Sequence, residues 1–372
     1  MKTLIFALIF MAVGSHAQEL KVTSYNAGLA HIFVPLAKER LPHIIDALKN
    51  HDADVLCLQE VWKKSDRKDI YKELEEFFSQ SHFTKIKNLR EGRRPTCKIK
   101  ELFGEGKFVS CMQTQCKDLD GDDFTDCILD KCGGALESLK NTNRQCATAL
   151  MAQVGKNTIL GMLTILNPIA RAGLFAYKGS DGLMLFSRYP IKDKSIADFS
   201  SISTLNRRRA LKATLDVEGK NVDVYCTHLS ADLSRTVPYT GKFDSWIEEN
   251  MAQINQLMEH AAVSASRSII MGDFNCGFAS PGIDSELENN CRRTQQFSFK
   301  NALEQIGPEC TFCQDNTLNA GETKSVAIDH VLYRGFDLID AHVEFKELVT
   351  LKDGKSTNLS DHYGVTAIFE LE

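Results

Sequence analysis

The sequence lacks three features that would assign its 372 residues to a broad class at once. After residue 17 no apolar run approaches the roughly 20 residues that span a bilayer, so we expect no transmembrane segment. A formal net charge of −5 gives no global basic field to recruit nucleic acid, although a local patch could still bind phosphates. The C-terminus carries no retention signal. These absences exclude an integral membrane protein and a globally basic one.

The N-terminus and the apolar content indicate an exported globular protein. Apolar residues make up 43% of the chain, enough for a large core in one big domain or two ordinary ones. Residues 1–17 combine Lys2, an apolar run from Leu4 to Val13, and the small-x-small pattern Ser15-His16-Ala17. We therefore predict a signal peptide at 1–17, a mature domain at 18–372 and a secreted, extracellular monomer. As a membrane anchor the run is too short.

Twelve cysteines fit export, because disulfides persist outside the reducing cytosol. Half of them fall between positions 97 and 146, which predicts a disulfide-tied insertion at about 87–153, with fifteen pairings open. A zinc module is disfavoured, since doubled Cys-x2-Cys spacing and clustered histidines are absent. Cys57 and Cys226 lie in apolar strands and are either buried thiols or one bridge. The last four should staple loops near residue 275: Cys276, Cys291, Cys310 and Cys313.

The stretch 269–275, Ile-Ile-Met-Gly-Asp-Phe-Asn, indicates a buried strand that ends in polar side chains. Asp273 and Asn275 are two positions apart, so an extended backbone points both to one face. A carboxylate can bind a hard cation or take a proton from water, and the amide can orient an oxyanion without adding charge. In isolation the same residues would be typical of a surface Asx turn.

Polar side chains occur at the ends of other predicted strands in the same way. The strands are predicted at 20–25, 55–58, 222–227, 326–333 and 364–371, and helices at 36–49, 66–78 and 247–262. Segments 210–217 and 222–227 read as a hairpin. At these strand ends lie Asn26, Glu60, His228, Asp329, His330, Asp361 and His362.

If the strands pack into one sandwich, these side chains converge in a single cleft. Carboxylate and amide oxygens suit Mg²⁺, with Mn²⁺ or Ca²⁺ as alternatives, better than zinc. Phosphoester hydrolysis needs a cation for the phosphate oxygens, a carboxylate for water and an imidazolium for the leaving oxygen. The residue set therefore predicts a metal-dependent phosphoester hydrolase.

Seven ordered motifs resemble those of the endonuclease/exonuclease/phosphatase superfamily, which includes deoxyribonuclease I and neutral sphingomyelinases. The resemblance covers nearly all of the mature chain except the insertion. It implies an α/β fold of four layers, with two packed mixed β-sheets between helices and the site at one edge. The motifs are Ser24-Tyr25-Asn26, Leu58-Gln59-Glu60-Val61, Ser187-Arg188-Tyr189-Pro190, Thr227-His228-Leu229, Gly272-Asp273-Phe274-Asn275, Ile328-Asp329-His330 and Ser360-Asp361-His362.

The resemblance also implies roles for the strand-end residues. Glu60 would bind the principal metal with help from Asn26, and Asp273 and Asp361 complete the predicted metal-binding set. Asp273 would also orient or deprotonate the attacking water, and Asn275 would hold the phosphate. His228 and His362 would form the acid/base and transition-state pair, with His362 steered by Asp329 or Asp361. His330 would support the site from behind.

Two substrate classes stay open, and a binding role remains a third alternative. The motifs at 60–62, 187–191 and 227–231 look more like neutral sphingomyelinases than nucleases, and the apolar stretch 158–166 could contact a lipid surface unless it is a core helix. Arg207, Arg208, Arg209 and Lys212 could instead grip a nucleic-acid backbone, as in a secreted deoxyribonuclease. We expect a phospholipid such as sphingomyelin, with peripheral membrane contact. A secreted binding protein that has lost turnover is the alternative of another class.

Overall fold

The computed structural model describes residues 18–31, 33–86, 97–119, 121–153, 161, 164–167, 175–235 and 237–371. The predicted signal peptide and the predicted start of the insertion lie outside the described residues, as does most of the apolar stretch 158–166. Within that stretch, Gly161 and 164–166 are helical, and Ile165 packs in the core of the insertion. No helix among the described residues is long and apolar enough to cross a membrane.

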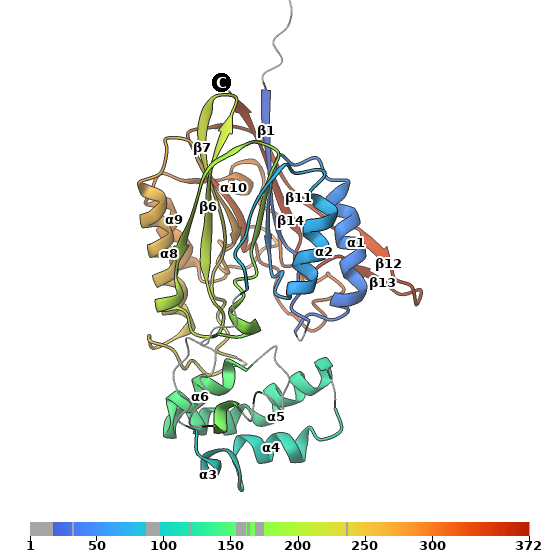
Figure 1. The fold of residues 1–372 in the computed structure, drawn as a ribbon, viewed down its shortest axis with the longest axis vertical. Coiled ribbons are helices and arrows are strands. Elements are labelled where there is room, and N and C mark those ends of the chain that lie inside the picture. The colour runs from blue at the N-terminus through green and yellow to red at the C-terminus, as the bar shows by residue number, and fades with distance from the viewer. Residues whose placement is uncertain are drawn as a thin grey trace, which may run out of the picture.

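Two six-stranded mixed sheets form the centre of the molecule (Figure 1). The first sheet has the order β11-β14-β1-β2-β4-β3, and the second has the order β5-β6-β7-β8-β10-β9. The strands of the first sheet are β1 Gln18–Asn26, β2 Val55–Gln59, β3 Gln80–His82, β4 Met184–Ser187, β11 Asp337–Glu344 and β14 Gly364–Leu371. Those of the second are β5 Ile191–Asp198, β6 Arg209–Val217, β7 Lys220–His228, β8 Ser268–Asp273, β9 Lys300–Asn301 and β10 Asp329–Arg334.

Helices cover the outer face of each sheet and complete the four layers. One apolar cluster fills the space between the sheets and includes Val22, Leu185, Val224 and Met271. A second joins the first sheet to α1 Ala37–Lys49 and α2 Lys64–Leu74, and a third joins the second sheet to α8 Trp246–Ala262 and α9 Glu288–Gln295. The predicted four-layer α/β fold is confirmed.

Periodicity in the sequence explains these layers. All five residues of β2 are buried, as expected for an apolar central strand with both faces covered. Ser245 caps the N-terminus of α8, because its side chain accepts a hydrogen bond from the backbone N–H of Glu248. The helix buries Ile254, Leu257 and Met258 on one face. Shorter elements lie outside the periodic runs: α10 Ala302–Ile306 and the hairpin of β12 Leu348–Thr350 with β13 Ser356–Asn358.

Strand register brings the polar strand ends to one edge. β1 runs parallel to β2 and pairs Asn26 with Gln59, while β7 runs parallel to β8 and pairs His228 with Asp273. β10 runs antiparallel to β8 and pairs Asp329 with Asp273. Because the carboxyl ends of parallel strands meet at the same edge, one end of the sandwich collects these side chains.

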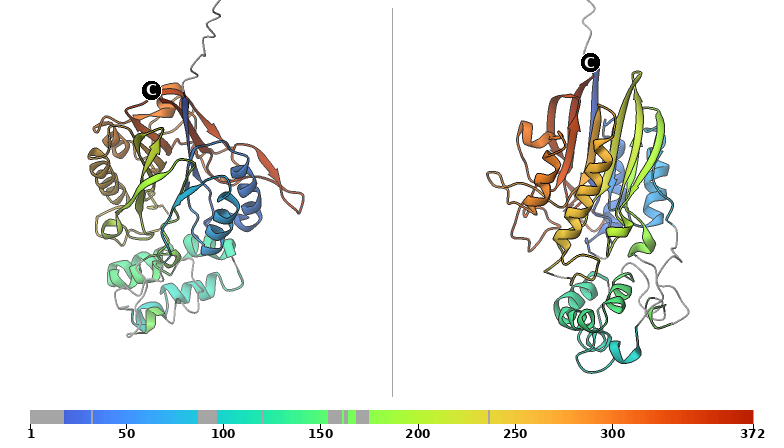
Figure 2. Two further views of the ribbon diagram at one scale, coloured as in Figure 1. Left: turned by 45° about the horizontal axis from the view of Figure 1, so that its top comes forward. Right: turned by 90° about the vertical axis from the view of Figure 1, so that its left-hand side faces the viewer.

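The predicted cysteine-rich insertion is a separate helical unit at this same end of the sandwich (Figures 1 and 2). It contains α3 Ile99–Leu102, α4 Phe108–Gln115, α5 Gly121–Thr142 and α6 Arg144–Met151. Its six cysteines pair only with one another in a nested order, Cys97–Cys146 around Cys111–Cys132 around Cys116–Cys127. The other pairs near the site are Cys276–Cys291 and Cys310–Cys313.

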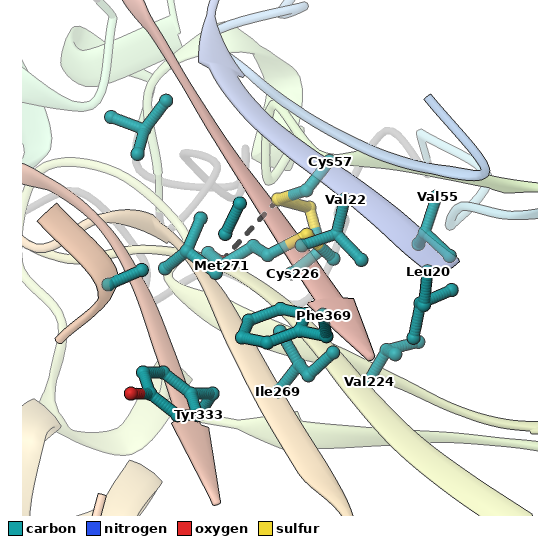
Figure 3. Packing of buried hydrophobic residues seen from close by; sticks show 14 of the residues in the cluster. Leu20, Val22, Val55, Cys57, Val224, Cys226, Ile269, Met271, Tyr333 and Phe369 are labelled. Atoms are coloured by element: carbon teal, nitrogen blue, oxygen red, sulfur yellow. Dashed lines mark hydrogen bonds between the residues drawn. A yellow bond between two sulfur atoms is a disulfide. The ribbon is translucent and has the colours of Figure 1, made fainter. Parts of the chain in front are cut away.

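The remaining pair, Cys57–Cys226, is one bridge rather than two thiols. It joins β2 of the first sheet to β7 of the second, and Figure 3 shows it among Val22, Met271 and Phe369. Its sequence separation of 169 residues is far larger than the 3 residues of Cys310–Cys313. A crosslink that closes a longer loop removes more entropy from the unfolded chain.

We predict that Cys57→Ala/Cys226→Ala lowers the free energy of unfolding by roughly 2–5 kcal/mol while the fold is retained. Denaturant unfolding followed by circular dichroism measures the loss. The matched control, Cys310→Ala/Cys313→Ala, closes a much shorter loop and should cost clearly less. Equal losses for the two pairs would contradict this account of the bridge between the sheets.

Candidate functional site

Asp273 lies at the centre of the polar edge, and it is 1% exposed. Its Oδ2 accepts a hydrogen bond from Asn26 Nδ2 at 3.0 Å, and its Oδ1 accepts one from the Asn275 backbone N–H at 2.8 Å. His228 Nε2 lies 3.4 Å and His362 Nε2 4.0 Å from Oδ2. Burial, followed by repulsion from Asp329, raises the Asp273 pKa to about 7. One carboxylate thus contacts four of the predicted site residues.

His362 is held by Asp329. Its Nδ1 donates to Asp329 Oδ2 at 2.8 Å, and Nε2 is left facing Asp273. Burial alone would lower the His362 pKa, but the carboxylates of Asp329 and Asp361 outweigh it and raise that pKa well above its usual range. Thr311 Oγ1 accepts the backbone N–H of Asp329 and so fixes the start of β10. Of the two partners that the sequence left open for His362, the hydrogen-bonded one is Asp329.

His228 differs from His362 in charge. It is 3% exposed, and its Nδ1 has no hydrogen-bond partner among the described residues. Burial, with positive charge from Arg208 and His362, keeps the His228 pKa well below its usual range. The edge therefore contains one imidazole that favours the neutral form and one that favours the cation.

Glu60 and Asp361 form the acidic part of the edge. Burial and then the Asp361 carboxylate raise the Glu60 pKa to about 7, with a smaller contribution from Asp273. Asp361 lies against the turn after β1, where Gly28 has a φ of +53°. A Cβ at that position would overlap the Asp361 carboxylate and the Ser360 hydroxyl, so this close approach requires glycine.

The backbone is strained at two site residues. Glu60 has a φ of +60° and Asn275 a φ of +52°, in the left-handed backbone region that residues other than glycine rarely adopt. Such strain is stored where the surrounding structure fixes a side chain for function. Asn275 Nδ2 donates to the Leu229 carbonyl at 3.0 Å, which joins the loops after β7 and β8. Sequence periodicity carries no signal for this strain.

The donor set fits a hard divalent cation. Within the described part of the chain, the Glu60 carboxylate has no hydrogen-bond donor, and the carboxylates of Asp361 and Asp273 raise its pKa while His362 and Arg208 lower it. Ligand atoms of Asp273, Asp329 and His362 also lie within 4.8 Å of one another, but Asp329 and His362 are already bonded together. The Glu60 carboxylate, which is repelled by Asp361 and Asp273, is therefore the better fit for a metal with oxygen ligands, although these three carboxylates do not all lie within 4.8 Å of one another. A cation there would relieve their mutual repulsion.

The predicted basic patch is not formed. Arg207 and Arg209 both pair with Asp198, and Lys212 pairs with Asp223. Arg208 turns inward and is 6% exposed, with its guanidinium 5.8 Å from the centre of the Trp62 ring. In the part of the chain that the structure describes, its Nε and Nη1 have no hydrogen-bond partner. Arg208 was predicted on the surface, because three adjacent arginines are typical of a solvent-exposed segment. That prediction was wrong. The carboxylates of Glu60 and Asp273 act electrostatically on Arg208 and favour its charged form.

Sequence reasoning missed Arg40, which supports the site. This buried guanidinium donates to the carbonyls of Pro35, Gly28 and Leu359 at 2.9, 2.6 and 2.5 Å. It thereby ties the turn after β1 to the segment before Asp361. An arginine on a predicted amphipathic helix reads as a surface residue, so the sequence offers no signal for this role.

His330 points away from the edge, as strand alternation requires after Asp329. Its Nε2 donates to the Cys276 carbonyl at 2.7 Å, and its Nδ1 lies 2.9 Å from Asn301 Nδ2. The predicted supporting position behind the site is consistent with these bonds. Cys276 and Cys291 lie close to it but are bonded to each other, so they are no metal ligands.

Three solved structures illustrate the fold similarity. SmcL is 14% identical, with 95% of this chain and 99% of that chain covered and a TM-score of 0.55. Sphingomyelinase C from Streptomyces griseocarneus is 14% identical, with 95% and 100% covered and a TM-score of 0.50. TDP2 of D. rerio with a single-strand DNA product is 12% identical, with 95% and 99% covered and a TM-score of 0.53. At these identities the likeness establishes the fold alone.

The sequence itself gives the family. No curated protein sequence matches the chain. A model described as the Endonuclease/Exonuclease/phosphatase family matches residues 24–362, which include all the predicted site residues and the insertion. The resemblance drawn from the seven motifs is confirmed, and so is the expected class of enzyme. The chain belongs to the Endonuclease/Exonuclease/phosphatase family of phosphodiester hydrolases.

Proposed function

We propose that the chain is a secreted, divalent-metal-dependent phosphodiesterase that hydrolyses the phosphodiester of a phospholipid headgroup such as that of sphingomyelin. The observation that carries the hydrolase is the contact of one buried carboxylate, Asp273, with His228 and with the Asp329-bound His362. Six disulfides support an extracellular location, because such bonds persist in oxidising compartments.

Glu60 and Asp361, with Asn26 and Asp273, would hold Mg²⁺, or alternatively Mn²⁺ or Ca²⁺. When bound there, the ion neutralises charge on the phosphate oxygens. Arg208 brings a second positive charge to the same edge through its unpartnered Nε and Nη1. The phosphate would thus be bound by the acidic edge only when the cation is present.

Asp273 is placed to orient a water molecule and accept its proton as the new P–O bond forms. His362, with Nδ1 fixed by Asp329, presents Nε2 on the same side and gives its proton to the departing oxygen as the old P–O bond breaks. His228 lies beside Asp273, and the Asn275 side-chain amide, which donates to the Leu229 carbonyl, follows Asp273 by two residues; both would hold the phosphate oxygens. Geometry therefore favours His362 over His228 as the general acid.

The loss of the surface basic patch favours a phospholipid over a long nucleic acid. Binding along a phosphate backbone needs several free cations, whereas Arg207, Arg209 and Lys212 are each paired with a carboxylate. A single buried Arg208 suits one phosphate. The second candidate is a deoxyribonuclease I-like endonuclease, which is supported by the likeness to a TDP2 structure with bound DNA product. A non-catalytic binding protein has no such support, since the predicted polar strand-end residues other than His330 are present at one edge.

We predict that Asp273→Asn lowers kcat/KM at least about 100-fold, because it removes the proton acceptor. Steady-state hydrolysis with saturating Mg²⁺ measures the loss. In chelator the variant should melt no lower than the wild type, since it removes one of several crowded carboxylates.

The matched control is Asp216→Asn, a carboxylate on the β6–β7 hairpin that pairs with Lys192. It should retain wild-type kcat/KM. Undiminished hydrolysis by the Asp273 variant would show that the reaction occurs elsewhere or arises from a contaminant.

Lipid and nucleic-acid substrates can be distinguished directly by hydrolysis assays. Sphingomyelin vesicles and plasmid DNA are each incubated with the protein, with Mg²⁺ and with chelator. We expect release of phosphocholine with Mg²⁺, little nicking of plasmid and no reaction in chelator. Plasmid cleavage without lipid hydrolysis would contradict the proposed phospholipid substrate and support a nuclease instead. Turnover in chelator would contradict the metal requirement.

A further inference from the structure

We propose that the helical insertion determines specificity: it covers the reactive edge, admits phosphodiesters with narrow, flexible substituents such as a phospholipid headgroup, and keeps duplex nucleic acid out. This rests on the proposed phosphodiesterase function. Figures 1 and 2 place the insertion beyond the end of the sandwich where β1, β2, β7 and β8 terminate. The insertion thus lies at the end of the sandwich where β8 ends at Asp273.

Helix α6 fastens the insertion to the segment 239–243, which lies between His228 and α8. Arg144 donates to the carbonyls of Thr240 and Phe243, each at 3.1 Å, and also to that of Gly241. Thr148 Oγ1 adds a bond to the Thr240 carbonyl at 3.2 Å. One guanidinium thus binds three carbonyls of this loop, which is a docking contact rather than a chance approach.

The C-terminal end of α6 reaches the wall of the site. Met151 is buried in a cluster with Trp62 and Tyr177, and the Trp62 and Tyr177 rings stack at 4.7 Å. Trp62 follows Glu60 by two residues, and the centre of its ring lies 6.1 Å from that of His228. The insertion therefore contributes Met151 to the apolar cluster that contains the aromatic residues beside the candidate reacting groups.

The docking segment is itself rigid. Tyr239 donates its hydroxyl to Glu249 Oε2 at 3.0 Å, and Ser230 Oγ donates to Glu249 Oε1 at 2.7 Å. Ser230 is two residues beyond His228, so the buried Glu249 joins the docking segment to the site. A Cβ on Gly241 would overlap the Thr204 and Tyr239 hydroxyls, so the close packing of this segment requires glycine.

The insertion can act as a fixed body because three nested disulfides and its own apolar core hold it together. Beneath it, His228, Asp273 and His362 are 3%, 1% and 7% exposed. Duplex DNA is stiff over about 150 base pairs and cannot bend at low cost to reach groups as buried as these. A lipid headgroup on single bonds can reach them.

The test compares kcat/KM for bis(4-nitrophenyl) phosphate, a small diester, with kcat/KM for a linear duplex oligonucleotide, both with Mg²⁺. The wild type should strongly favour the small diester. Arg144→Ala and Arg144→Ala/Met151→Ala should raise the duplex-to-small-diester ratio at least tenfold, with the small-diester value within twofold of wild type. Arg144→Lys should restore part of the selectivity.

The control is Lys140→Ala, because Lys140 pairs only with Glu137 on its own helix α5 among the contacts of the described residues. It should leave the ratio unchanged. A ratio unaltered in both Arg144 variants, a wild type that cleaves duplex as readily as the small diester, or an equal rise in the control would each overturn the role of the insertion. Failure of the wild type to hydrolyse the small diester would instead overturn the proposed function.

Discussion

Acidic side chains lie close together at one buried edge of the sandwich and repel one another. This repulsion is the constraint on which the rest of the structure depends. Burial and neighbouring carboxylates raise the pKa of both Glu60 and Asp273 to about 7. Such a cluster costs free energy unless a cation offsets the charge. The fold holds the cluster in place although it is unfavourable, which is typical of a site kept for function rather than for stability.

Several devices hold the edge against that repulsion. Parallel pairing of β1 with β2 and of β7 with β8 aligns the strand ends, and the Cys57–Cys226 disulfide joins the two sheets behind them. Arg40 ties the loop after β1 to the segment before Asp361, and Thr311 fixes Asp329. Holding the edge together leaves the backbone strained at Glu60 and Asn275, which both have a positive φ.

Much of the site could be predicted from the sequence because strand ends are marked by periodicity. Asp273, His228 and Asn26 each follow an apolar or alternating run, so their shared edge follows from strand pairing alone. The hydrogen-bond partner of His362 could not be predicted, because Asp329 and Asp361 both fit the same strand-end pattern in the sequence. Only the packing of β10 against β14 decides between them. Arg208 was misplaced because its inward rotation depends on Trp62 and the acidic edge, which lie far away in the chain. Strands such as β11 were missed because their burial alternates weakly.

The central claim is that separated strand-end carboxylates share one divalent cation. Crystals of the protein grown with Mn²⁺ and measured at the manganese absorption edge test it most directly. The account predicts an anomalous peak within about 2.5 Å of oxygen atoms from Glu60 and at least one of Asn26, Asp273 and Asp361. A peak bound elsewhere on the surface, with none of these oxygens as a ligand, would contradict it.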